Sequence, residues 1–191
     1  MSVDAFDDVP EVMRIAMRAY NASLRLGITK GIDRSRAVLA MARALNNAFD
    51  DILEANTLDL EASREMAVPE LILDWLKLTP ERLEAAVDIL QRLGELPDPL
   101  RRVRTADYQL DDSQTYSHLM PLGVIAFIYE AFPELGAIAA AMCIKTGNSI
   151  ILKGSTESSH SNAAIVDVLQ NAILDKGLPV GSIELITSEH G

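Results

Sequence analysis

The sequence has very few residues of the types that build disulfides and metal centres. It contains a single cysteine, Cys143, and its three histidines, His118, His160 and His190, are far apart along the chain. One cysteine excludes an internal disulfide and any zinc site made from several cysteines. The histidine spacing matches no common metal-binding motif. We therefore expect a protein without a metal site.

Positive charge and long hydrophobic segments are also scarce. The chain carries 17 lysines and arginines against 28 aspartates and glutamates, a formal net charge of −11. This balance opposes binding to nucleic acid, whose phosphates require clustered cations. The longest apolar run, residues 135–144, is about half the length of a membrane-spanning helix, and the acidic start of the chain does not resemble a secretory signal. The sequence predicts a cytoplasmic protein that binds neither nucleic acid nor membranes.

The 191 residues correspond to about one domain. Their composition, 49% hydrophobic and 24% charged, is typical of a globular protein. The residue pattern changes twice along the chain. It separates a helical segment, a polar segment and a segment of alternating strands and helices, namely residues 1–96, 97–120 and 121–191.

The helical segment shows apolar residues at spacings of three and four, as in amphipathic helices. This spacing predicts helices over residues 9–26, 33–54, 57–66, a short helix after Pro69 and a longer one from Pro80. Gly27 is expected to end the first helix, and Asp33 is expected to cap the second. Arg34 is expected on the solvent side of the second helix. Thr79 before Pro80 is a strong helix start, because it combines an N-cap hydroxyl with proline at the first helical position.

The polar segment predicts a β-hairpin. Pro97 and Pro99 break the preceding helix, and side chains then alternate in character over residues 108–110 and 115–119. Residues 111–114 have the composition of a turn. Two roles are open for this hairpin: a charged, solvated sheet edge, or an arm that pairs with a partner subunit.

The last segment predicts strand, helix, strand, helix and strand. Residues 123–129 and 149–153 are short, continuous apolar runs, typical of strands buried on both faces of a parallel sheet. Helices are expected over 135–145 and 162–176, and a third strand over 183–187. This order is half of a doubly wound, Rossmann-like parallel sheet, so the fold class is α/β.

Ligands of such sheets bind beyond the carboxyl ends of the strands, which are followed here by residues 130–134, 153–161 and 188–191. Lys153, Gly154, Ser155 and Glu157 offer a cation, free backbone N–H groups, a hydroxyl and an acceptor for ribose hydroxyls. Neither of the two common glycine-rich phosphate loops is present. The turn alone therefore fits either a nucleotide site or an ordinary polar loop, and His160 is expected to be a polar residue of that loop.

Two stretches, residues 121–131 and 143–154 with its CIKTGNSIILKG sequence, resemble the gamma-glutamyl phosphate reductases, a branch of the aldehyde dehydrogenase superfamily. Further motifs resemble that branch in the same order: Ala55-Asn56 with Asp59, Leu78-Thr79-Pro80-Glu81-Arg82-Leu83, Asp98-Pro99, Asn162-Ala163-Ala164 and Gly177-Leu178-Pro179. The resemblance covers nearly the whole chain. It implies a partial nucleotide-binding domain of the aldehyde dehydrogenase type, with residues 97–120 as an oligomerisation arm.

The resemblance also implies an activity: the NADPH-dependent reduction of gamma-glutamyl phosphate to glutamate-5-semialdehyde in proline biosynthesis, by way of a cysteine thiolate. NADH is the alternative cofactor. Lys153 matches a lysine that contacts the adenosine ribose or its 2′-phosphate, and Glu157 matches a ribose-binding carboxylate with an offset of one residue. Glu130, Ala131 and Phe132 are expected at the mouth of the substrate site. The implied partners are a small-molecule substrate and further copies of the chain.

Two departures from the family pattern leave alternatives open. Where the family usually reads Tyr-Glu-Ala-Arg-Pro-Asn, this chain has Phe132 and Glu134, which makes another aldehyde or acyl phosphate an alternative substrate. The family's catalytic cysteine lies beyond position 191, and Cys143 does not match it. We therefore expect the N-terminal half of such an enzyme, without a catalytic residue and inactive alone. It would be completed by a C-terminal half, or act as a nucleotide-binding or protein-interaction module.

Overall fold

The computed structural model describes residues 10–101, 103–105 and 116–187. Its helices are α1 (Glu11–Ile28), α2 (Gly31–Asn47), α3 (Phe49–Glu65), α4 (Glu70–Leu76), α5 (Pro80–Glu95), α6 (Glu134–Lys145) and α7 (Ser159–Leu174). The strands are β1 (Val103–Thr105), β2 (Tyr116–His118), β3 (Val124–Ile128), β4 (Ser149–Lys153) and β5 (Ile183–Leu185). Short 3-10 turns cover Pro99–Arg101 and Thr156–Ser158.

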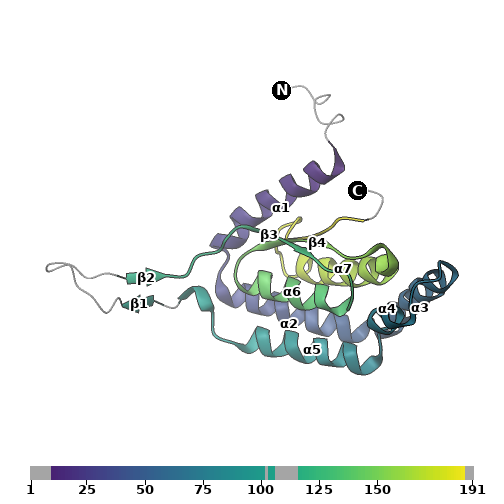
Figure 1. Cartoon of the computed structure of the whole chain (residues 1–191). Helices are drawn as coiled ribbons and strands as arrows, with labels where there is room; N and C mark the ends of the chain where they lie inside the picture. The colour runs from purple at the N-terminus through teal and green to yellow at the C-terminus, as the bar shows by residue number, and fades with distance from the viewer. Residues whose placement is uncertain (1–9, 102, 106–115, 188–191) are drawn as a thin grey trace.

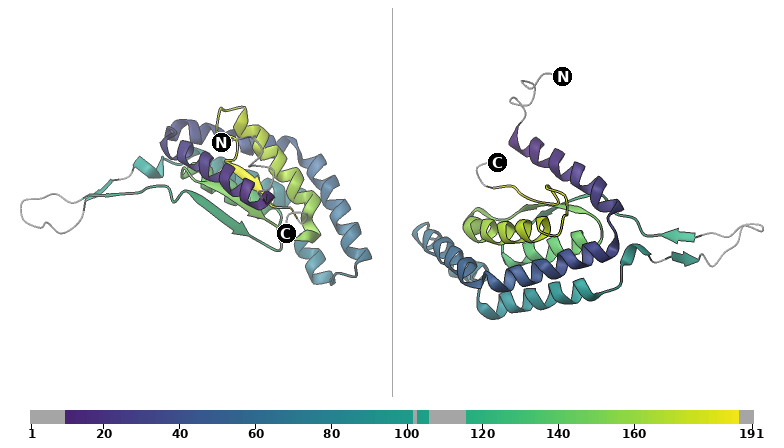
Figure 2. Two further views of the ribbon diagram at one scale, coloured as in Figure 1. Left: turned by 90° about the horizontal axis from the view of Figure 1, so that it is seen from above. Right: turned by 180° about the vertical axis from the view of Figure 1, so that it is seen from behind.

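A parallel sheet with the order β3-β4-β5 forms the centre of the fold and confirms the predicted α/β class. Helix α1 lies on one face of this sheet and α6 and α7 lie on the other, with α2 and α5 as an outer layer (Figures 1 and 2). Ile128 at the end of β3 lies beside Lys153 at the end of β4. The carboxyl ends of these two strands therefore meet at one edge of the sheet.

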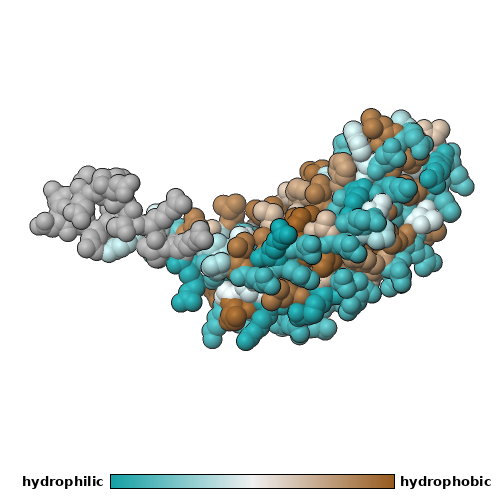
Figure 3. Space-filling view, turned by 90° about the horizontal axis from the view of Figure 1, so that it is seen from below, coloured by the Kyte–Doolittle hydropathy of each residue, from teal (hydrophilic) through white to brown (hydrophobic). Residues whose placement is uncertain are grey.

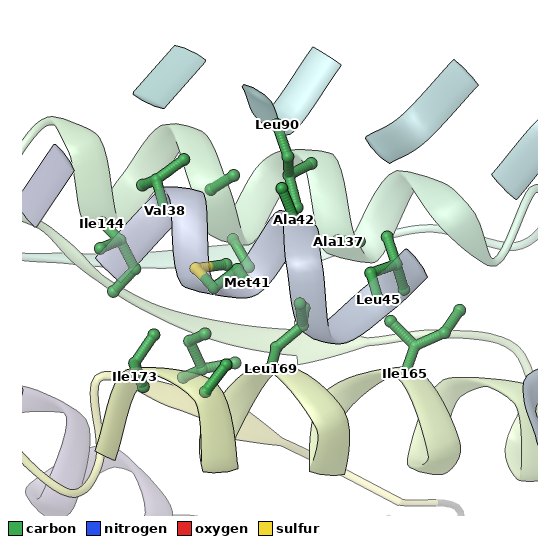
Figure 4. Packing of buried hydrophobic residues seen from close by; sticks show 14 of the residues in the cluster. Val38, Met41, Ala42, Leu45, Leu90, Ala137, Ile144, Ile165, Leu169 and Ile173 are labelled. Carbon is green, nitrogen blue, oxygen red and sulfur yellow. The ribbon is translucent and has the colours of Figure 1, made fainter. Parts of the chain in front are cut away.

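The main core lies between the helix layers and the sheet. Side chains of α2 interdigitate with those of α5, α6 and α7, among them Val38, Met41, Ala42, Leu45, Leu90, Ala137, Ile144, Ile165, Leu169 and Ile173 (Figure 4). A smaller cluster places Ile15 and Ala19 of α1 against Ile151 of β4. Burying these apolar side chains is the main driving force that holds α1 and α2 on the two sides of the sheet.

A two-stranded antiparallel ribbon, β1 paired with β2, projects from the body of the molecule (Figures 1 and 2). The predicted strand at 108–110 and the predicted turn at 111–114 lie outside the described residues. The first described strand is at 103–105, where none was expected. Leu119, Met120 and Leu122, which lead from the ribbon back to the sheet, are exposed.

Several helix boundaries differ from the predictions. Helix α1 continues through Gly27 to Ile28, and α2 begins at Gly31, ahead of Asp33, with no side-chain cap. Asp33 lies instead in the first turn of α2, where it pairs with Arg36 at 3.4 Å. The helix expected over 33–54 is broken at Ala48, whose ψ of 16° departs from helical geometry. Thr79 caps α5 as predicted, because its hydroxyl accepts a hydrogen bond from the backbone of Arg82 at 3.3 Å.

Two predictions about burial were wrong. Strand β3 is not buried on both faces: Ile128 is 77% exposed, because β3 lies at the edge of the sheet that the structure describes. Arg34 does not face solvent but is 2% exposed. Its guanidinium donates to Asp98 at 2.8 Å and to the backbone carbonyl of Lys145 at 3.3 Å.

Lys145 belongs to the same buried network as Arg34. Its ammonium donates to the Ser35 hydroxyl at 2.7 Å and to the backbone carbonyls of Gly94 and Leu96. Burial lowers the pKa of Lys145, and nearby Asp98 opposes that change. The network ties α2, α6 and the end of α5 together.

The surface mixes hydrophilic and hydrophobic side chains, as the view in Figure 3 shows. Within the described ranges, no helix has both the length and the apolar character needed to span a membrane.

Candidate functional site

A cavity of about 740 Å³ lies beyond the carboxyl ends of β3 and β4. This volume is in the range of small-molecule sites. The cavity brings together the predicted site residues from both segments, and is lined by Ile72, Trp75, Ile128, Tyr129, Glu130, Ala131, Phe132, Leu135, Lys153, Gly154, Ser155, Thr156 and Glu157. The third predicted segment, 188–191, lies outside the described residues. Ile72 and Trp75 come from α4 and were not predicted from the sequence.

The loop after β4 is held in place by a glycine and a buried asparagine. Gly154 packs so closely on Asn162 that a Cβ atom at this position would lie 2.0 Å from the Asn162 amide nitrogen. Asn162 accepts a hydrogen bond from the Tyr129 hydroxyl at 3.0 Å and donates to the Ser158 hydroxyl at 2.9 Å. Burial raises the pKa of Tyr129, so this phenol stays protonated and donates. The end of β3 and the loop after β4 are therefore fixed to each other.

Asp59 of α3 caps the amino end of α7. Its carboxylate accepts hydrogen bonds from the backbone N–H groups of His160 at 3.0 Å and Ser161 at 2.7 Å, and from the Ser161 hydroxyl at 2.6 Å. It also lies 2.8 Å from the His160 ring nitrogen. This cap explains why α7 starts at Ser159, three residues before the predicted start, and why His160 lies in a helix and not in a loop. The Asp59 carboxylate thus occupies the amino end of α7, so this helix end is not open to an anionic ligand. Lys153 remains as the positively charged group that lines the cavity.

The polar groups of the cavity are largely free to bind a ligand. Among the described residues, the Lys153 ammonium donates only to the carbonyl of the adjacent Gly154, at 3.0 Å. Glu130 and Glu157 form no hydrogen bond or ion pair within the part of the chain that the structure describes. The site thus offers one cation for an anionic group and two carboxylates for hydroxyl or ammonium groups.

Two aromatic side chains, Trp75 and Phe132, also line the cavity. Phe132 has a positive φ of 59°, which is unusual for a residue with a side chain, and its ring centroid lies 6.1 Å from that of Trp75. The Arg82 guanidinium lies 5.1 Å from the centre of the Phe132 ring. Arg82 also binds both carboxylate oxygens of Glu134, at 2.6 and 2.8 Å. The two residues that depart from the family pattern, Phe132 and Glu134, therefore belong to one packed unit.

A second cavity of about 740 Å³ lies at the start of α2 and is lined in part by Lys30, Arg34, Arg36 and Arg101. Two of its cations are already paired, Arg34 with Asp98 and Arg36 with Asp33. Its position is away from the carboxyl ends of the strands, where parallel sheets bind ligands. We therefore assign the candidate site to the cavity that holds Lys153.

Cys143 does not have the surroundings of a nucleophile. It is buried in α6, and burial raises its pKa to about 11. We expect Ellman's reagent to react with Cys143 in the folded chain at least about 100-fold more slowly than in urea. In the folded chain little of the thiol is ionised and the reagent cannot easily reach the buried sulfur. Equal reaction rates with and without urea would contradict this expectation.

The pKa of Cys143 is higher in the folded chain than in the unfolded chain. Ionisation of the thiol should therefore reduce the free energy of unfolding as pH rises above about 8.5, where the thiol of the unfolded chain ionises first.

The described part of the chain contains no group of three or more histidine, cysteine or acidic residues placed to hold a metal ion.

The chain was compared with known proteins. The family model described as "Aldehyde dehydrogenase family" matches residues 4–191. Gamma-glutamyl phosphate reductase 2 of Synechocystis sp. is 55% identical over 96% of this chain and 44% of its own length. The crystal structure of gamma-glutamyl phosphate reductase from Thermotoga maritima has a TM-score of 0.86 at 28% identity, over 93% of this chain and 43% of that one. The corresponding enzyme structure from Saccharomyces cerevisiae has a TM-score of 0.84 at 31% identity, covering 92% and 46%. The chain thus spans less than half the length of these relatives.

Proposed function

This chain belongs to the aldehyde dehydrogenase family, and from that premise we propose that it forms the nucleotide-binding part of a gamma-glutamyl phosphate reductase. The reaction is the NADPH-dependent conversion of gamma-glutamyl phosphate to glutamate-5-semialdehyde and phosphate, in proline biosynthesis. The observation that carries the proposal is the cavity beyond β3 and β4, where Lys153 and Glu157 face the same space. The names of the related proteins support the choice of substrate.

The residues of the cavity fit a nicotinamide dinucleotide. Lys153 would hold the 2′-phosphate or the ribose of the adenosine, and Glu157 would accept hydrogen bonds from ribose hydroxyls. Ser155 and Thr156 add hydroxyl groups, and the glycine at 154 lets the loop lie close to Asn162. Lys153 favours NADPH over NADH, since only NADPH carries the additional anionic group. When bound, the cofactor supplies the hydride.

The remaining parts of the proposal concern the substrate and the assembly. Glu130, Ala131 and Phe132, which line the same cavity, would form the mouth of the substrate site. The nucleophilic thiolate would come from outside these 191 residues, because Cys143 is buried and protonated. The β1–β2 ribbon would pair with another subunit in a cytoplasmic homo-oligomer, since isolated two-stranded ribbons are marginally stable.

The test is an assay of the complete gene product in the reverse direction, with glutamate-5-semialdehyde, inorganic phosphate and NADP⁺. We expect NADP⁺ reduction that depends on phosphate, and no turnover by residues 1–191 alone. Absence of turnover by the complete gene product would overturn the proposal. Turnover without phosphate would indicate an ordinary aldehyde dehydrogenase.

A further inference from the structure

The mouth of the cavity presents two aromatic rings beside a free carboxylate. Trp75 is 40% exposed and Phe132 is 38% exposed, so a ligand can reach both rings although they pack on each other. Glu130 is exposed, lines the same cavity, and has no ion-pair partner among the residues that the structure describes. The apolar side chains of Ile72 and Leu135 complete this end. Aromatic faces next to a carboxylate are complementary to an organic cation.

The cation in contact with the aromatic rings, Arg82, is not available to bind an anionic ligand. Arg82 is held by both oxygens of Glu134, donates to the backbone carbonyls of Trp75 and Lys77, and lies over the Phe132 ring. Lys153 is the other cation of the cavity and ends β4 beside Ile128; in the proposed function it binds the cofactor. With Arg82 paired and Lys153 assigned to the cofactor, an anion placed at Trp75 would meet Glu130 with no cation left among the described residues of the cavity to offset it.

We propose that Trp75, Phe132 and Glu130 recognise the free ammonium group of the substrate. This inference rests on the proposed function, because it assigns a binding partner to the α-ammonium of gamma-glutamyl phosphate and of the semialdehyde. Trp75 attracts the cation through its ring quadrupole, Phe132, whose ring already lies against Arg82, supports Trp75 by packing on it, and Glu130 adds a charged hydrogen-bond acceptor. An acylated nitrogen is neutral, so the same site gives a substrate with an N-acetyl group no such attraction.

Arg82 and Glu134 act as positioning residues in this assignment. The guanidinium fixes the α4–α5 junction through the carbonyls of Trp75 and Lys77, and it fixes the first turn of α6 through Glu134. The backbone N–H of Phe132 also donates to the carbonyl of Trp75 at 3.3 Å. These contacts keep the two rings at the mouth and hold Phe132 in its left-handed conformation, which a surrounding structure must enforce.

The experiment measures reverse-direction kinetics of the complete gene product with glutamate-5-semialdehyde and with its N-acetyl derivative. The free amine cyclises to an imine, so each variant is compared with the wild type on the same substrate. We expect Trp75→Leu and Glu130→Gln to raise KM for the amine by about 3- to 30-fold while kcat changes little. KM for the N-acetyl derivative and for NADP⁺ should change by less than about twofold. Trp75→Phe should recover part of the affinity, because it restores a ring face.

One control variant and the choice of Glu130→Gln separate recognition from folding. Leu71→Ala removes an exposed apolar side chain of the same helix α4 outside the cavity, and should leave all three KM values unchanged. Glu130→Gln changes an exposed carboxylate to an amide of the same shape. This substitution should therefore leave the packing of the core, and hence the folding of the chain, unchanged.

The outcomes distinguish this inference from the proposed function. Equal increases in KM for the amine and the N-acetyl derivative would overturn the ammonium assignment while the wild-type enzyme remains active. An increase confined to NADP⁺ would overturn it as well, and would place the cofactor's base against the rings. Absence of wild-type turnover with glutamate-5-semialdehyde would overturn both proposals.

Discussion

Replacing Asp59 by alanine is expected to lower the free energy of unfolding by about 2–4 kcal/mol. The carboxylate is 2% exposed and accepts hydrogen bonds from two backbone N–H groups and one hydroxyl in the first turn of α7. Loss of a helix cap costs about 0.5–2 kcal/mol, and leaving charge-assisted hydrogen bonds unmade adds to that cost. Because these bonds join α3 to α7, the change also loosens the support beneath the cavity.

Urea denaturation of the chain measures this effect, with Asp51→Ala as the matched control. Asp51 lies on the same helix α3 but is exposed, so its loss should change stability by less than about 0.5 kcal/mol. The loss of stability for Asp59→Asn should fall between the losses for Asp59→Ala and Asp51→Ala. An amide has one acceptor oxygen, whereas the Asp59 carboxylate uses two. A loss below about 1 kcal/mol for Asp59→Ala would show that α7 does not depend on this cap.

Replacing Lys153 by methionine is expected to raise the Kd for NADPH by about 10- to 100-fold, which corresponds to the loss of a charge-assisted hydrogen bond. The substitution keeps the aliphatic stem, and within the described ranges the ammonium makes one hydrogen bond, to the carbonyl of Gly154, so the fold should be preserved. If Lys153 binds the 2′-phosphate, the Kd for NADH should rise by less than about fivefold.

Fluorescence titration of the complete gene product measures both constants. The control is Lys30→Met, the same change at an exposed lysine that lines the other large cavity. This control should leave both constants unchanged. An effect of Lys30→Met that equals or exceeds that of Lys153→Met would move the cofactor to the cavity at the start of α2. Equal increases for NADPH and NADH would place Lys153 at the ribose.

Local sequence signals predicted the elements that depend on neighbouring residues. The Thr79 cap and the parallel strands β3, β4 and β5 were found from short patterns, because their causes lie within a few residues. The same patterns placed Lys153 and Phe132 at neighbouring strand ends, and the structure brings both to one cavity. Topology made that step possible, since parallel strands share one edge.

Contacts between distant segments could not be predicted in this way. Asp59 lies 101 residues before the backbone N–H of His160 that it accepts from, and Arg34 lies 64 residues before Asp98. Helical periodicity places such residues on one side of a helix but does not show which segment covers that side. The sequence pattern therefore predicts a solvent-exposed Arg34. In the structure its guanidinium is buried and donates hydrogen bonds to Asp98 and to two backbone carbonyls. Asp59 lies among the buried residues of α3. An acidic residue on the buried side of a helix is the signal that could have indicated a distant cap.

The aromatic mouth shows the same limit. The sequence shows Phe132 and Glu134 together as one departure from the family pattern, but does not indicate what either residue contacts. In the structure they are coupled, because Arg82 binds Glu134 and lies over the Phe132 ring, while Trp75 packs on that ring. Trp75 was placed in a helix by its surroundings in the sequence, but nothing local indicated that this helix lines the cavity.

Hydrogen–deuterium exchange of the complete gene product, with and without NADPH, tests the central claim most directly, namely that the cofactor binds beyond β3 and β4. The account predicts slower exchange on adding NADPH in residues 129–135 and 153–158, with little change in residues 29–36. Protection of residues 29–36 and 94–101, with none at the strand ends, would contradict it.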